Sequence, residues 1–142
     1  MTYGEGDHPV WFVAFFPRST SHWWNWMAVG RWKHVACLKF NVGLGLWQVF
    51  GYGLDGMEAL HLTRRELVLL VGGWKAQGAA FLMIEQGASI RPERNLLMTC
   101  VGMVKALTRQ GGSALRPSAL YSNMRRCGAV PAWESDDDAA SD

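Results

Sequence analysis

The chain has 142 residues, of which 49% are hydrophobic and 18% are charged. This length and composition are sufficient for one domain with a buried core, and they do not indicate a second domain. The formal net charge is +2, but residues 1–133 hold 14 basic and seven acidic residues, whereas the last nine residues hold five acidic ones. We therefore expect a single domain over 1–133 and an acidic, flexible tail over 134–142.

The first predicted element is a strand. The run VWFVAFF, residues 10–16, is rich in β-branched and aromatic residues and ends at Pro17, as expected for a buried strand. The segment STSHWWNWMAVGRW, residues 19–32, follows, and we expect a short helix or turn whose tryptophans cover the core. A stacking platform for bases or sugars is the alternative use of these tryptophans.

Residues 34–53 predict a β-hairpin, because two β-forming runs flank the turn sequence NVGLG. We expect Phe40 opposite Leu46, a register that places Tyr52 opposite His34 with Gln48 on the same face. A slip of one residue would put a glycine in the place of Tyr52.

A capping box precedes the next element. Thr63 is followed three residues later by Glu66, which predicts a helix from about 64 to 77 that ends near a glycine. Residues 79–85, AAFLMIE, then predict a further strand.

Two helices are expected in the last third of the chain. Val101, Val104 and Leu107 recur at intervals of three, which predicts a helix over about 99–110. A shorter helix should begin at Pro117, because proline is favoured in a first turn. These elements together predict an α+β fold.

Cys100 lies at the predicted start of a helix, with Thr99 as the N-cap. Unpaired amides and the helix dipole favour an anion there, so we expect the thiolate of Cys100 to be stabilised and its thiol to be the most reactive in the chain. The alternative is an ordinary small core residue.

Several short motifs between residues 10 and 125 resemble one family. They are Phe16-Pro17, the segment from Trp23 to Trp26, the hairpin strand HVACLKF opened by His34, WKAQG at 74–78, and TCVGMVK at 99–105. The set resembles the circularly permuted branch of the papain-like thiol amidases, in which the histidine precedes the cysteine. This branch includes the NlpC-type peptidases and lecithin retinol acyltransferases, and the pattern is similar to that of small phage and proteobacterial proteins.

The resemblance implies a papain-like α+β fold, in which an antiparallel sheet packs against the helix that carries the cysteine. It implies that Cys100 is the nucleophile and His34 the general base and later the general acid. The family also places a polar residue on the second hairpin strand to orient the imidazole. This chain offers Tyr52 or Gln48 there and no carboxylate, which is a departure from the family pattern.

The resemblance implies a cysteine hydrolase that cleaves an amide bond of peptidoglycan peptides through a thioester. Proteolysis and acyl transfer are related possibilities for the same site. The alternative function is a catalytically inactive papain-like domain that serves as a structural or docking component of a phage tail or virion. Eight tryptophans and six phenylalanines favour protein partners through an aromatic-rich surface.

Other functional classes lack support. The three cysteines are odd in number and have no CxxC spacing, and the histidines have no metal-ligand spacing, so we expect no disulfide framework, metal or cofactor. Nucleic-acid binding would depend on charge alone and is not expected. No signal peptide or membrane span is apparent, so we expect synthesis in the cytoplasm, with association with a virion as a further possibility.

Overall fold

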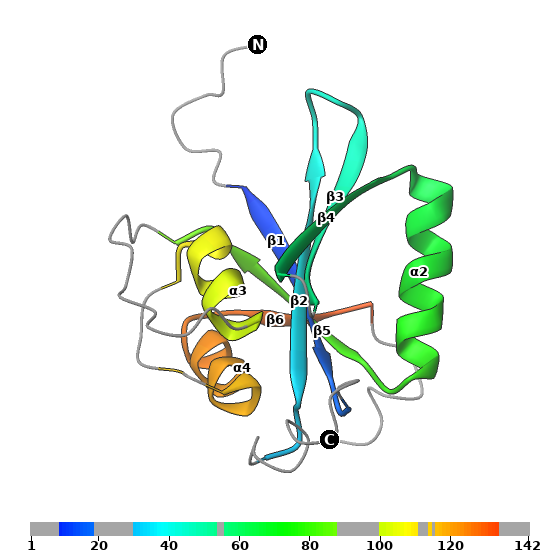
Figure 1. Ribbon diagram of the computed structural model, residues 1–142. Coiled ribbons are helices and arrows are strands. Elements are labelled where there is room, and N and C mark those ends of the chain that lie inside the picture. Colours follow the sequence, from blue (N-terminus) through cyan, green and yellow to red (C-terminus); the bar gives the residue numbers. More distant parts are fainter. Residues whose placement is uncertain are drawn as a thin grey trace.

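The computed structural model describes residues 9–18, 30–53, 56–87, 100–110, 114 and 116–133. Within these ranges the fold is α+β: six strands form one antiparallel sheet, and three helices pack on it (Figure 1). The elements in chain order are β1 (Val10–Phe16), β2 (His34–Asn41), β3 (Leu46–Gly53), β4 (Gly56–Leu62), α2 (Arg64–Ala76), β5 (Ala80–Glu85), α3 (Cys100–Thr108), α4 (Pro117–Arg126) and β6 (Val130–Ala132).

The sheet has the strand order β4-β3-β2-β1-β5-β6, so β1 and β2 lie at its centre. The predicted strands at 10–16 and 79–85, the hairpin, and the helices at 64–77, 99–110 and from Pro117 are confirmed. The two edge strands, β4 and β6, were not predicted from the sequence. Residues 19–29 of the tryptophan segment 19–32 lie outside the described residues, as do Thr99 and the acidic tail at 134–142.

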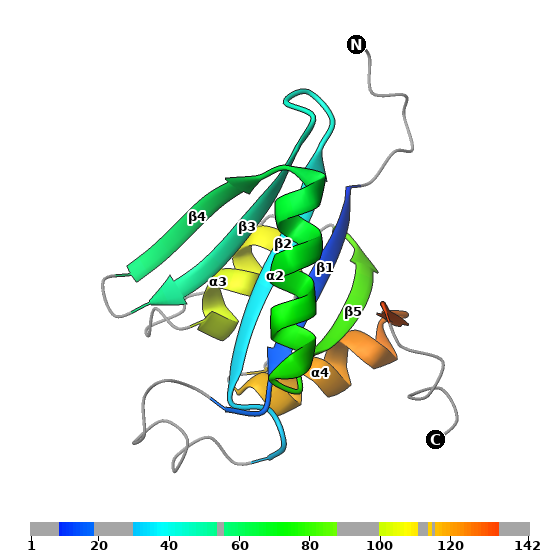
Figure 2. The same ribbon diagram turned by 90° about the vertical axis from the view of Figure 1, so that its right-hand side faces the viewer.

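The two faces of the sheet are covered by different helices. In Figures 1 and 2, α2 lies on one face, and α3 and α4 lie on the other. Because side chains alternate along a strand, β1 supplies Val13 and Phe15 to the core under α3 and α4, and Ala14 and Phe16 to the core under α2. We call these the α3/α4 face and the α2 face.

The register of the β2–β3 hairpin differs from the expected one by one residue. Asn41, and not Phe40, lies opposite Leu46. The cause is a four-residue turn in which Asn41 is hydrogen-bonded twice: its carbonyl accepts from the Gly45 amide at 2.9 Å, and its side-chain oxygen accepts from the Leu44 amide at 3.1 Å. The side chain of Asn41 thus favours this turn and determines the register.

The two residues of the expected capping box, Thr63 and Glu66, bind each other at the start of α2, with Thr63 as the N-cap. The Glu66 amide donates to the Thr63 hydroxyl at 3.3 Å, and this hydroxyl donates to the Glu66 carboxylate at 3.0 Å. The helix ends at Ala76 and is followed by Gly78, whose φ of +88° suits the reversal into β5. Leu67 of α2 then packs on Leu38 and Val49, which covers the centre of the sheet.

Candidate functional site around Cys100

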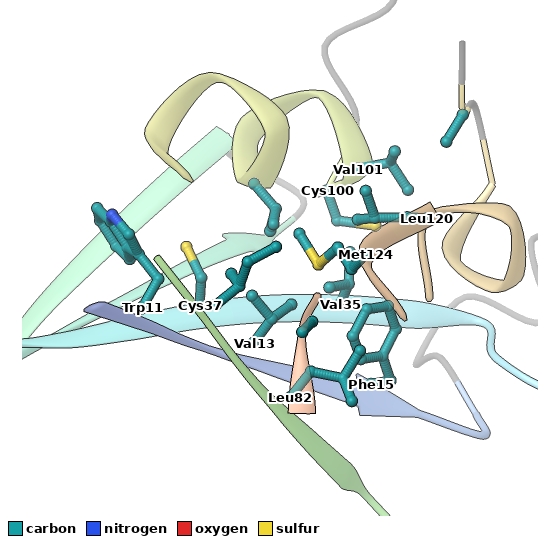
Figure 3. Close-up of a cluster of buried hydrophobic side chains, with 14 of the residues drawn as sticks. Trp11, Val13, Phe15, Val35, Cys37, Leu82, Cys100, Val101, Leu120 and Met124 are labelled. Atoms are coloured by element: carbon teal, nitrogen blue, oxygen red, sulfur yellow. The ribbon is translucent and has the colours of Figure 1, made fainter. Parts of the chain in front are cut away.

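Cys100 is the first residue of α3 and belongs to the core on the α3/α4 face. Its side chain is 6% exposed, and Figure 3 shows it beside Val101 and Leu120, above the strand that carries Val35. The thiol of Cys100 therefore experiences two opposing effects: the helix start favours the thiolate, and the apolar core favours the neutral thiol.

Three backbone amides surround the sulfur of Cys100. They belong to Val35, Val101 and Cys100 itself, and their hydrogen bonds favour the thiolate. Val35 can take this role because the pairing of β2 with β3 begins only at Cys37 and Phe50, so β3 does not pair with Val35. The thiol of α3 occupies the place where the two strands separate.

The expectation that the helix start stabilises the thiolate of Cys100 is wrong once the burial of this thiol is included. Burial raises the pKa of the Cys100 thiol, and the three amides offset this rise only in part. A helix start lowers a thiol pKa when solvent can reach the sulfur, whereas removal from water penalises the charged form more strongly. In the described conformation Cys100 is a neutral, shielded thiol.

The imidazole of His34 lies on the α2 face. His34 is paired with Phe16, and the two ring centroids are 5.7 Å apart, while Phe16 itself packs in the core under α2. Burial lowers the pKa of His34, so the neutral imidazole is favoured, as a general base requires. The structure thus places the side chains of His34 and Cys100 on opposite faces of the sheet and does not bring them together.

The two residues expected to orient the imidazole are elsewhere. Gln48 lies opposite Lys39, and its side-chain nitrogen is 3.1 Å from a ring nitrogen of His61 on the exposed part of the neighbouring strand. Tyr52 is paired through the backbone with Met57 of β4 and not with His34. The shift of one residue in the hairpin register accounts for both differences.

Sequence reasoning missed two contributors to this site. The amide of Val35 carries no sequence signal, because any residue except proline provides a backbone N–H. Ser118 of α4 binds the backbone of Trp32 just before β2. A serine that follows Pro117 is typical of the first turn of any helix. The sequence therefore gives no signal of this contact, which joins residues far apart in the chain.

A cavity lies beside the end of β5 and the turn that follows α4. It has a volume of about 440 Å³ and is lined by the end of β5, including Met83 and Glu85, and by Cys127 and Val130. Cys127 and Cys100 are both free thiols, but Cys127 is exposed and Cys100 is buried. In the described part of the chain, no group of three or more His, Cys, Asp or Glu side chains is arranged to hold a metal ion.

Comparisons of the chain with protein-family models, with curated proteins and with solved structures find no match. Among the described helices, none combines the length and the apolar character needed to cross a membrane.

Proposed function

We propose that the protein is a cysteine hydrolase of the permuted papain-like kind, with Cys100 as nucleophile and His34 as general base. The observation that carries this proposal is the hydrogen bond to the Cys100 sulfur from the amide of Val35, the residue that follows His34. A thiol at a helix start is thereby bonded to the peptide group that joins His34 to Val35.

The position of the His34 backbone beside the Cys100 sulfur supports the proposal. The Val35 amide belongs to the peptide group that joins His34 to Val35, so the Cys100 sulfur lies close to the His34 backbone. The His34 ring lies on the α2 face, so the proposed mechanism requires it to turn toward the gap between β2 and β3, where the sulfur lies.

The chemistry follows from these groups. His34 takes the proton of Cys100, the thiolate attacks an amide carbonyl, and the first-turn amides of α3 stabilise the oxyanion. The C–N bond then breaks as the imidazolium returns the proton to the leaving amine. Water, activated by the same imidazole, hydrolyses the thioester and releases the acid and the free thiol.

The proposed substrate is an amide bond of a peptidoglycan peptide, on the strength of the resemblance of the motifs around His34 and Cys100. The basic body of the chain, with twice as many basic as acidic residues in 1–133, suits an anionic wall polymer. A protein of a phage particle that opens the cell wall is the setting we propose.

The test is turnover of purified peptidoglycan peptides by the wild-type protein and by Cys100→Ser, His34→Ala and Cys127→Ser. We expect the first two variants to lose at least about 10³-fold in rate, since the pair acts as a unit, and the exposed Cys127 to be dispensable. Equal rates in wild type and Cys100→Ser would refute the proposal.

A second candidate function is a non-catalytic docking domain of the same fold in a virion or tail assembly. The position of the His34 ring on the α2 face favours it, as does the outer surface of α2, where Val68 is 63% and Leu69 is 71% exposed. This candidate predicts no turnover by the wild-type protein and unchanged assembly in both site variants. Loss of assembly in Leu69→Asp with retained folding would support it.

A further inference from the structure

Ser118, in the first turn of α4, binds both polar groups of one backbone position. The Trp32 amide donates to the Ser118 oxygen at 2.9 Å, and the Ser118 hydroxyl lies 3.4 Å from the Trp32 carbonyl oxygen, to which it donates. One side chain of α4 thus replaces the strand partner that Trp32 would have in a sheet.

The chain passes so close to Ser118 that only glycine fits beside it. A Cβ on Gly30 would lie 2.4 Å from the Ser118 oxygen, and Gly30 has a φ of +109°, which other residues rarely adopt. The Trp32 ring is 4% exposed and lies 6.1 Å from the ring of Phe15 and 5.7 Å from that of Tyr121. Backbone and side chain are both held on α4.

This attachment lies directly before the candidate site. Trp32 precedes His34 by two residues and Val35 by three. Between them, the Lys33 amide donates to the Phe16 carbonyl at 2.8 Å, which fixes the other side of the segment to β1. Residues 32–35 therefore form a short bridge from α4 to the sulfur of Cys100, with few degrees of freedom left.

We propose that Ser118 is a positioning residue: it fixes the start of β2 and so holds the Val35 amide against the Cys100 sulfur, with the His34 backbone beside it. The inference rests on the proposed function in that it assigns the thiol as the group to be positioned. The contact itself joins α4 to the site through the backbone, so Ser118 touches no reacting atom.

The test compares Ser118→Ala with Ser122→Ala, a matched change at an exposed serine of the same helix. The readout is the rate at which iodoacetamide alkylates Cys100, followed by mass spectrometry from pH 6 to pH 10. With the Trp32 backbone released, the Val35 amide supports the thiolate less well, so the midpoint of the rate curve should move to higher pH in Ser118→Ala and stay in place in Ser122→Ala. A merely structural role would lower the melting temperature and leave this midpoint unchanged.

A folded Ser118→Ala protein with the wild-type midpoint would overturn the inference. If that variant does not fold, amide hydrogen exchange of the wild-type chain decides: the Trp32 and Val35 amides should exchange at matching slow rates, as parts of one rigid unit. Exchange of the Val35 amide much faster than that of Trp32 would also overturn it. Alkylation and exchange need no substrate, so absence of turnover would count against the proposed function alone.

Discussion

The backbone amide of Val35 donates to the sulfur of Cys100, and the imidazole of His34, one residue earlier, lies on the opposite face of the sheet. The nucleophile and the base of the proposed mechanism are thus neighbours through the backbone and separate through their side chains. The proposed mechanism requires the His34 imidazole to turn from the α2 face toward Cys100.

The three thiols should react in an order that follows burial. Cys127 is exposed, Cys100 is 6% exposed, and Cys37 is fully buried with a pKa raised to about 12 by burial. We expect iodoacetamide at pH 8 to label Cys127 first, at least about tenfold faster than Cys100, and Cys37 last. Peptide mapping after timed quenching measures the order, and labelling of Cys37 before Cys100 would show that the core is not packed as described.

The fold was largely predictable because its signals are local. The aromatic run before Pro17, the capping box at Thr63 and the recurrent valines of α3 each depend on a few neighbouring residues. The edge strand β4, GMEALHL, was not predicted because its mixed pattern is typical of neither a strand nor a helix. It is a strand because it pairs with β3.

The site was less predictable because it depends on register and rotamer. The position of Cys100 at a helix start followed from sequence, but its burial by α4 did not. The side chain of Asn41, bonded in the turn, shifts the hairpin by one residue and removes Tyr52 from the place opposite His34. A single side-chain hydrogen bond in a turn leaves no sequence pattern from which the register could be predicted.

The centre of the sheet should be sensitive to truncation. Leu38 is fully buried and packs with Val49 and Leu67. Leu38→Ala should lower the free energy of unfolding by about 2–5 kcal/mol, through lost burial and the cavity left behind. The matched change Leu69→Ala, at a residue of α2 that is 71% exposed, should cost no more than about 0.5 kcal/mol. Urea denaturation measures both, and equal losses would contradict the assignment of the α2 face.

Stability should fall in alkaline solution. Burial raises the pKa of Cys37 from an ordinary value of 9.0 to about 12, so the folded chain keeps a proton that the unfolded chain loses. The stabilisation is complete below pH 9 and declines as the pH rises from 9 toward 12, by about 1.4 kcal/mol per pH unit for this group. Urea denaturation at several pH values should show a shallower decline for Cys37→Ala than for wild type, and parallel curves would contradict this assignment.

The central claim, that His34 and Cys100 act as a pair, is tested most directly by the pH dependence of Cys100 alkylation in wild type and His34→Ala. If the imidazole reaches the thiol, wild type retains reactivity toward iodoacetamide near neutral pH, and His34→Ala loses it by about tenfold or more while remaining reactive at high pH. Alkylation curves for Cys100 that coincide in the two proteins from pH 6 to pH 10 would contradict the claim and assign Cys100 to the core.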